Sequence, residues 1–492
     1  MDFVFDSVVQ KGNNKGVGFL KISEVSDLFD INQQVRCTIF SDSAHQDFFS
    51  KIKKYSNSKG IYVPKDICAI NDFFGKRIKV KLAKINGFYS KIGADGKFYI
   101  PLEVAQQLKL EDKDILKIKV ILPDGSVLEK YSLVRFREHK GSCEYSLVLN
   151  SKLKGIGGII NLEKLQSQIL KKKSNELVIT KLLKGLNFAR INNDKFIILE
   201  PNKQPIFLRS DIKLKDIAYY LGCYFADGTK RGNSWAIAAS TLEQARFYLD
   251  MHAFLTFESV LDFTLSYTKS NKNNISESEL IRIWESYLGI TRIKRRFRFA
   301  KGVNAGKTNE YGTLIMRKHK MLLLVVYNRL LEILISEIIK TKNFDLAEDF
   351  ICGVLEGDGC PNAKTRGHII ITTNLKELRI LGKVFKCSGI SYKLREDSKG
   401  KNNGTITIGS LEILKNFNNL KDKLFAHYPK RRKLLFERLK KVGGVRYMLG
   451  MQDYASSWVK AELKKQGLLN NKYKLTVKGQ KMADYFNNLN IF

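Results

Sequence analysis

The sequence contains little that would support a disulfide-rich, zinc-binding or membrane protein. Its seven cysteines form no CxxC pair, and its six histidines show no spacing typical of metal ligands. No apolar run approaches the roughly 18 residues that a membrane-spanning helix needs, and the first residues, MDFVFD, are not typical of a signal peptide. We therefore expect a cytoplasmic protein with reduced cysteines and no membrane partner, associated with the nucleoid if the host is a prokaryote.

Acidic residues are also few compared with basic ones. The chain has 49 Asp and Glu against 85 Lys and Arg, which gives a formal net charge of +36 and a pI near 9.7. An excess of this size attracts polyanions and gives DNA an affinity that depends strongly on salt. A Lys-rich proteome would also raise the pI, but it would normally raise the glutamate content as well. The composition therefore favours a nucleic-acid partner.

Two short motifs of matching form lie in the middle of the chain. Residues 220–228 read YLGCYFADG and residues 351–359 read ICGVLEGDG, each after a segment with helical apolar spacing. A helix that ends in Gly is common, but a carboxylate in the last turn lies against the negative end of the helix dipole. Because this unfavourable placement occurs twice, it indicates that Asp227 and Asp358 bind something positive.

The glycines inside the motifs indicate how the two acids come together. Gly222 and Gly353 lie on otherwise large apolar helices, so they would let the two backbones approach closely. The acids at the helix ends would then lie side by side, held by a divalent metal or a shared proton. The alternative is two unrelated core helices that each end in Gly, which the matched form of the two motifs disfavours.

These motifs resemble those of the LAGLIDADG homing endonucleases. The second motif matches the family pattern at every place, allowing Ile for Leu, Cys for Ala and Glu for Asp, whereas the first departs from it at Phe225. The resemblance covers roughly residues 177–440. It implies an α+β fold with two pseudo-symmetric αββαββα halves in a monomer. It also implies that Asp227 and Asp358 are catalytic, bind Mg²⁺ and act on double-stranded DNA.

A basic segment near the end of each half contains the other catalytic candidates. HYPKRRKLLF (427–436) resembles the Tyr-Pro segment ending in Lys that precedes the last helix of many family members, and MRKHKMLL (316–323) is its counterpart. A lysine near each metal can polarise the attacking water or neutralise charge in the transition state. We favour Lys320 and Lys433, with Lys318 and Lys430 as rivals. The alternative is a basic helix start that contacts backbone phosphates.

Strands predicted after each motif are candidates for DNA contact, because antiparallel ribbons can enter the major groove and read base edges with alternate side chains. The predicted strands are 235–238, 368–372, 391–395 and 405–408. Taken one at a time, each nearby basic residue fits a solvated charge better than a DNA contact. As a set, the candidates for phosphate or guanine contact are Lys230, Arg231, Lys364, Arg366, Lys393, Arg395, Lys430 and Arg431.

The amino-terminal region, residues 1–150, contains an internal repeat. SKGIYVPKDI (58–67) leads to GKRIKV, DGKFYIPLEV (95–104) leads to DILKIKV, and a fainter copy, KGVGFL (15–20), leads to VRCTI. Each copy predicts a strand, a one-turn helix opened by Pro or its equivalent, and an alternating strand. The pattern is similar to the swapped-hairpin, AbrB-like DNA-binding barrels, in which two such units interlock. A generic β-barrel without a DNA role is the alternative.

Two further segments complete the predicted organisation. Residues 151–176 have a helical pattern around Leu162 and Leu165, which predicts a connecting helix or linker. Residues 441–492 contain an amphipathic helix, SWVKAELKKQGLL, followed by a short wing and another helix. This pattern resembles the second half of a winged-helix domain, a common DNA-binding module.

The sequence thus predicts a site-specific double-strand DNA endonuclease of the kind carried by introns and other mobile elements. The alternative is a DNA-binding transcriptional regulator that kept the fold and lost the chemistry, because barrels and winged helices are common parts of regulators and the first motif is imperfect. We favour the endonuclease, since a protein that only binds DNA has no need of two carboxylates that repel each other.

Overall fold

The chain folds into two compact units, residues 1–167 and 168–492, in the computed structural model. Both units contain helices and strands, so the predicted α+β class is confirmed at that level. The structure describes residues 2–488 apart from 12–16, 32, 41–44, 56–57, 72, 85–86, 94–95, 123–124, 140–141, 150–154, 166–180, 202, 258–260, 270–274, 300–310, 362–366 and 398–401.

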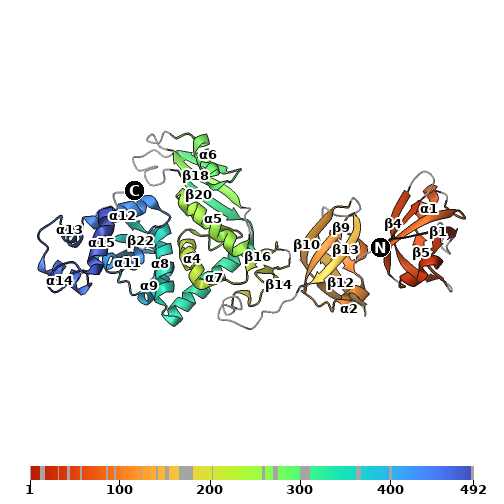
Figure 1. The fold of residues 1–492 in the computed structure, drawn as a ribbon, viewed down its shortest axis with the longest axis horizontal. Coiled ribbons are helices and arrows are strands. Elements are labelled where there is room, and N and C mark those ends of the chain that lie inside the picture. The colour runs from red at the N-terminus through yellow and green to blue at the C-terminus, as the bar shows by residue number, and fades with distance from the viewer. Residues whose placement is uncertain are drawn as a thin grey trace. The chain divides into compact units, whose positions relative to one another are not determined.

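The first unit begins with a closed barrel of six strands in the order β1-β2-β5-β4-β3-β6 (Figure 1). The strands form two units, β1-β2-β3 and β4-β5-β6. Exchanging each strand with its equivalent in the other unit leaves the order of neighbours around the barrel unchanged, so two copies of one unit interlock. Each copy has a short helix between its second and third strands, as the repeat predicted. The elements are β1 (Asp2–Lys11), β2 (Gly18–Lys21), η1 (Ser23–Leu28), β3 (Gln34–Phe40), β4 (His45–Tyr55), β5 (Ser58–Val63), α1 (Lys65–Asn71) and β6 (Arg77–Lys84).

A second β domain follows, with sheets β10-β9-β13-β7 and β11-β12-β8. Its pairings repeat those of the barrel: β9 pairs with β10 and β13 as β3 pairs with β4 and β6, and β8 pairs with β12 as β2 pairs with β5. The third sequence repeat therefore lies in this domain. The elements are β7 (Phe88–Lys91), β8 (Lys97–Ile100), α2 (Leu102–Gln107), β9 (Ile115–Ile121), β10 (Val127–Leu133), β11 (Arg135–His139), β12 (Ser142–Val148) and β13 (Gly157–Lys164).

Strand β13 corrects the interpretation of residues 151–176 as a connecting helix. Leu162 lies in this strand opposite Ile118 of β9, and Ile160, opposite Val120, is fully buried. An apolar run of this length fits a buried strand as well as a helix, and only the partner strands decide between them. The rest of the predicted connection, residues 166–176, lies outside the described residues.

The second unit begins with a small sheet of β14 (Phe188–Asn192), β15 (Lys195–Ile198) and β16 (Ile206–Arg209), followed by two halves of matching element order. Their sheets are β17-β20-β18-β19 and β21-β22-β24-β23, and all four strands predicted after the motifs are present. The first half contains α4 (Leu214–Asp227), β17 (Trp235–Ala239), α5 (Leu242–Thr256), β18 (Asp262–Lys269), α6 (Glu277–Leu288), β19 (Lys294–Phe299), β20 (Thr313–Lys318) and α7 (Met321–Thr341).

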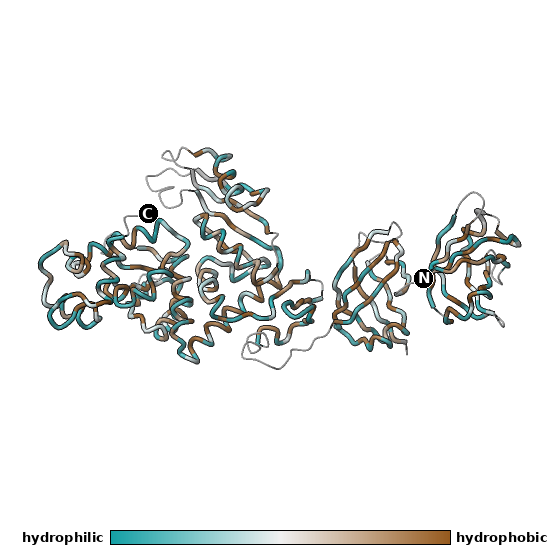
Figure 2. Tube along the Cα trace, in the orientation of Figure 1, coloured by the Kyte–Doolittle hydropathy of each residue, from teal (hydrophilic) through white to brown (hydrophobic). Residues whose placement is uncertain are grey.

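The second half repeats this order in a shorter form, and its described residues contain no counterpart of α6 and β19. It contains α8 (Phe344–Asp358), β21 (Cys360–Pro361), β22 (Ile369–Asn374), α9 (Leu375–Ser388), β23 (Lys393–Glu396), β24 (Asn403–Ile408), α10 (Ser410–Lys415), α11 (Phe417–Leu420) and α12 (Pro429–Lys440). In both halves the helices cover one face of the sheet, where alternate apolar residues such as Ile369 and Ile371 are fully buried. Figure 2 shows the hydrophobic residues gathered along these packed elements.

The carboxyl-terminal helices share a core with the second half. They are α13 (Gly443–Met448), α14 (Ser457–Lys465) and α15 (Val477–Asn488), and an isolated antiparallel bridge joins Leu469 and Leu475 before α15. Phe486 of α15 stacks on Phe417 of α11, with ring centroids 5.1 Å apart. Among the helices that the structure describes, none has the length and apolar content that crossing a membrane requires.

Candidate active site at the paired helix ends

Helices α4 and α8 pack against each other at a distance that only glycine allows (Figure 1). A Cβ atom added to Gly222 would lie 2.2 Å from the carbonyl oxygen of Phe350, and one added to Gly353 would lie 1.9 Å from the carbonyl oxygen of Tyr219. Both clashes are with backbone atoms, which a rotamer change does not relieve. The predicted close approach at the two motif glycines is therefore confirmed.

This packing brings the last residues of the two helices together. Asp227 ends α4 and Asp358 ends α8, and a Cβ added to Gly357 would lie 2.5 Å from Oδ2 of Asp227. Burial, followed by the negative charge of Asp358, raises the pKa of Asp227 to about 7. Burial also raises the pKa of Asp358. Two carboxylates with raised pKa values in one place gain strongly from a bound cation.

Two basic side chains compensate part of this negative charge. The guanidinium of Arg431, from the first turn of α12, donates from Nη1 to the carbonyl oxygens of Gly357 (2.7 Å) and Glu356 (3.3 Å). It therefore satisfies carbonyl groups that the end of α8 leaves without a partner, and its charge lowers the pKa of both aspartates. We predicted Arg431 as a DNA contact. In the structure its guanidinium donates hydrogen bonds to the end of α8. Its contact with DNA stays a prediction.

The second basic side chain is Lys230, which follows the first motif. Its ammonium group forms an ion pair with Glu377 of α9, in the other half, and lies 4.3 Å from the centroid of the Phe225 ring. Burial has the largest effect on the pKa of Asp358 and raises it. The charge of Lys230 has the next largest effect and lowers it. Phe225 is the place where the first motif departs from the family pattern, and its contact with Lys230 is a physical reason for an aromatic residue there.

Glu356 is a buried acid that the sequence interpretation left without a role. Its carboxylate accepts hydrogen bonds from the hydroxyl of Tyr219 (2.8 Å), Nε2 of Gln244 (3.3 Å) and the backbone N–H of His427. The side chain is fully buried, and burial raises its pKa to about 7. Glu356 therefore ties α8 to α4 and α5. Its place inside the motif, two residues before Asp358, was the signal that could have identified it.

The predicted catalytic lysines lie on the expected segments. Lys320 precedes α7 and donates to the carbonyl oxygen of Pro205 (2.9 Å), whereas Lys433 is exposed on α12. Lys318 ends β20, and Lys430 is exposed at the start of α12. The cations that act on the pKa values of the two aspartates are Lys230 and Arg431. The catalytic roles of Lys320 and Lys433 stay predictions.

Two of the other candidates for DNA contact lie on the face of the second sheet that the helices leave open. Lys393 and Arg395 lie on β23 opposite Thr407 and Thr405, and both basic side chains are exposed. Arg231 is exposed in the turn after α4. Lys364 and Arg366 lie outside the described residues.

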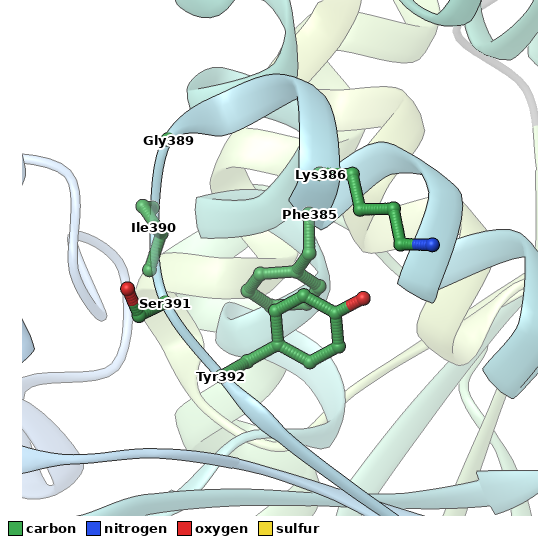
Figure 3. Close-up of a pocket in the computed structure, with 6 residues that line it drawn as sticks. All are labelled: Phe385, Lys386, Gly389, Ile390, Ser391 and Tyr392. Carbon is green, nitrogen blue, oxygen red and sulfur yellow. The ribbon is translucent and has the colours of Figure 1, made fainter.

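A surface pocket follows α9, lined by Phe385, Lys386, Gly389, Ile390, Ser391 and Tyr392 (Figure 3). The rings of Phe385 and Tyr392 form one wall, with centroids 5.0 Å apart. None of these residues is acidic, so the pocket offers no carboxylate to a metal ion. The paired helix ends remain the site with the features of an active centre.

The chain matches no family model and no curated protein. Among solved structures it is similar to I-DmoI, a homing endonuclease. A chain from a study of mesophilic I-DmoI variants is 14% identical, with 43% of this chain and 96% of that chain covered and a TM-score of 0.22. I-DmoI in complex with DNA and Ca is 12% identical, with 44% and 93% covered and a TM-score of 0.21. Similarity this low assigns no function to the chain.

Proposed function

We propose that the chain is a metal-dependent double-strand DNA endonuclease of the LAGLIDADG type. One observation carries the proposal: two helices pack at glycine-only distance and bring Asp227 and Asp358 together at their ends. The net charge of +36 supports a polyanionic substrate. A monomer fits this arrangement, since both motif helices come from one chain.

The residues at the helix ends fit a hard divalent cation such as Mg²⁺. Mg²⁺ is commonly held by one or two carboxylates, with substrate phosphates and water completing its coordination. The described residues contain no group of three or more His, Cys, Asp or Glu side chains that could enclose a metal ion. Asp227 and Asp358 would therefore hold the metal together with the DNA phosphates. A bound metal would activate water and stabilise the leaving oxygen.

The surrounding residues position these carboxylates. Glu356, with its partners on α4 and α5, fixes the last turn of α8. Arg431 satisfies the carbonyl groups at the end of that helix, and Lys230 links the first motif to α9. Both cations keep the aspartates more ionised than burial alone would allow, and ionised carboxylates are the form that binds metal.

The test is to replace each aspartate separately by asparagine. Wild-type protein, with Mg²⁺ or Mn²⁺, is first used to select cleaved sites from a plasmid library with randomised inserts. With the selected site, D227N and D358N are expected to lose double-strand cleavage by about a hundredfold or more. Their DNA affinity in EDTA should stay close to that of the wild type.

Two matched controls lie at the other ends of the same helices. D216N and D345N remove an exposed carboxylate from the first turns of α4 and α8, and both are expected to leave cleavage unchanged. Wild-type cleavage rates in the D227N/D358N double variant would falsify the proposal. Specific binding by the wild type without cutting in either metal would favour the non-cleaving regulator instead.

We further propose that the amino-terminal β domains and helices α13–α15 add DNA affinity. The interlocked strand–helix–strand units support an AbrB-like role for the β domains. The exposed basic side chains of Lys464 and Lys465 on α14 support a winged-helix role for the carboxyl terminus.

A further inference from the structure

The two halves of the second unit differ at one edge of their sheets. In the second half the edge strand is β23, and among the strands that the structure describes its one partner is β24. In the first half the equivalent strand, β18, is covered by a further strand, β19, which pairs with it in parallel after the crossover helix α6. The sheet of the first half therefore extends one strand further on this side.

The added segment is built into the core of the first half. Leu280 and Trp284 of α6 are fully buried, and Nε1 of Trp284 donates to the carbonyl oxygen of Tyr311 (2.8 Å). Helix α6 also packs against α5. This anchoring fixes the position of β19 along the sheet edge.

The register decides which basic residues of β19 face the open side of the sheet. Lys294 lies opposite Thr264 and Arg296 opposite Ser266. These two partners alternate on β18 with Phe263, Leu265 and Tyr267, which are buried toward the helices. Lys294 and Arg296 therefore lie on the open face, because paired residues in neighbouring strands point to the same side. Arg295, opposite Leu265, lies on the other face.

We propose that β19 extends the DNA-contacting surface of the first half, so that this protein contacts its DNA asymmetrically. The inference rests on the proposed function and places the double-stranded DNA against the open faces of both sheets, where antiparallel ribbons can enter the major groove. Lys294, Arg295 and Arg296 are all exposed, and the equivalent edge of the second half carries Lys393 and Arg395. Neighbouring strands lie ~4.8 Å apart and base pairs ~3.4 Å apart. The extra strand thus reaches about one base pair further.

Two other interpretations of the basic strand make different predictions. Basic residues on an edge strand discourage pairing with another sheet. In that role Lys294, Arg295 and Arg296 would contribute equally, whichever face they lie on. Lys294 also lies 3.9 Å from Asp262, but this ion pair is well exposed and contributes little. A DNA contact, by contrast, depends on the face and involves Lys294 and Arg296 but not Arg295.

The experiment is a binding selection with the full-length protein and a randomised DNA duplex library in Ca²⁺. Wild type, K294Q/R296Q, the matched control R295Q and the second-half variant K393Q/R395Q are compared. K294Q/R296Q is expected to lose base preference at one end of the selected site only, with affinity lower by about tenfold or more. K393Q/R395Q should act at the opposite end, and R295Q should retain the wild-type profile.

The salt dependence gives an independent measurement. Because K294Q/R296Q removes two positive charges from the DNA-contacting face, the slope of log affinity against log salt should also be shallower, by up to about 2. An unchanged profile and slope, or an equal effect of R295Q, would overturn the proposed extension and leave edge protection as the role of β19.

Cleavage measurements distinguish a failure of the endonuclease proposal from a failure of the proposed DNA contact by β19. Cleavage of the wild-type site is measured in Mg²⁺ at saturating concentrations of each variant. Cutting by wild type, with a K294Q/R296Q profile like that of wild type, overturns the extension alone. Selection of a site that wild type binds but does not cut overturns the endonuclease, while a one-ended loss in K294Q/R296Q still supports the DNA contact.

Discussion

At the residue scale, the paired aspartates oppose folding when no metal is bound. Each carboxylate lies at the negative end of its own helix, and burial and mutual repulsion raise the pKa of Asp227 to about 7. The ordinary value of 3.8 applies to the unfolded chain. Between these two values the folded chain binds more protons than the unfolded chain, so stability falls as the pH rises through this window.

D227N should therefore stabilise the metal-free protein, and more so at high pH. In EDTA at pH 8 we expect the variant to gain at least about 1 kcal/mol over wild type, since one unit of pKa corresponds to about 1.4 kcal/mol. At pH 5, closer to the unfolded value of 3.8, less of the window has been crossed, so the gain should be clearly smaller than at pH 8. Thermal unfolding at both pH values measures it. An equal gain at pH 5 and pH 8 would contradict the raised pKa.

Glu356 provides a second prediction at this scale. E356A removes the carboxylate that accepts from Tyr219, Gln244 and the backbone N–H of His427. Tyr219 and Gln244 each keep a backbone carbonyl as a second acceptor, so we expect a loss of about 2–3 kcal/mol and reduced cleavage. E356Q keeps one acceptor oxygen and should lose less, and Y219F should cost about 1 kcal/mol. Urea unfolding of the three variants gives this order. A change in E356A no larger than that in Y219F would show that the carboxylate does not link the helices.

At the scale of elements, the contact between α4 and α8 depends on the motif glycines. G353A places a methyl group against the backbone of Tyr219, so the helices must move apart. We expect a loss of stability of about 1–3 kcal/mol and lower cleavage, because Asp227 and Asp358 separate. The readouts are the free energy of unfolding and the cleavage rate on the selected site.

Gly382, in the interior of α9, is the matched control. A Cβ there meets nothing nearer than Leu394 Cδ1 at 3.4 Å, an ordinary contact. Because Ala is the better helix former by up to about 1 kcal/mol, G382A should be neutral or stabilising and should leave cleavage intact. Similar effects of G353A and G382A would mean that close approach is not what the motif glycine provides.

At the scale of the whole molecule, the shared core of α15 and the second half determines which fragments fold. A fragment that ends near residue 440, at the predicted domain boundary, removes Tyr485 and Phe486 and exposes Phe417 and Phe436. We expect such a fragment to be strongly destabilised, whereas residues 168–492, a compact unit, should fold and cut. Thermal unfolding and cleavage of the two fragments compare them directly.

The fragment 168–492 also tests the role of the amino-terminal β domains. If these domains contact phosphates, the fragment should bind DNA more weakly and with a shallower dependence of log affinity on log salt than the full chain. Equal slopes for the fragment and the full chain would mean that the β domains do not touch DNA.

The sequence by itself determined the features that depend on neighbours along the chain. Helix ends at the two Asp-Gly pairs, the helix starts after Pro64 and Pro101, and the strand at residues 368–372 were all predicted before any packing was known. Local sequence is sufficient for these features, because capping, the proline ring and strand periodicity act within a few residues.

The tertiary structure alone decided what depends on contacts across the chain. Leu162 lies in a strand because β9 is there to pair with it, and Glu356 gains its role from Tyr219 and Gln244 on other helices. Lys230 and Arg431, predicted as DNA contacts, became neighbours of the aspartates through the packing of separate elements. Such contacts leave no local pattern, because hydrogen bonds and charge effects depend on distance in space and not on separation along the chain.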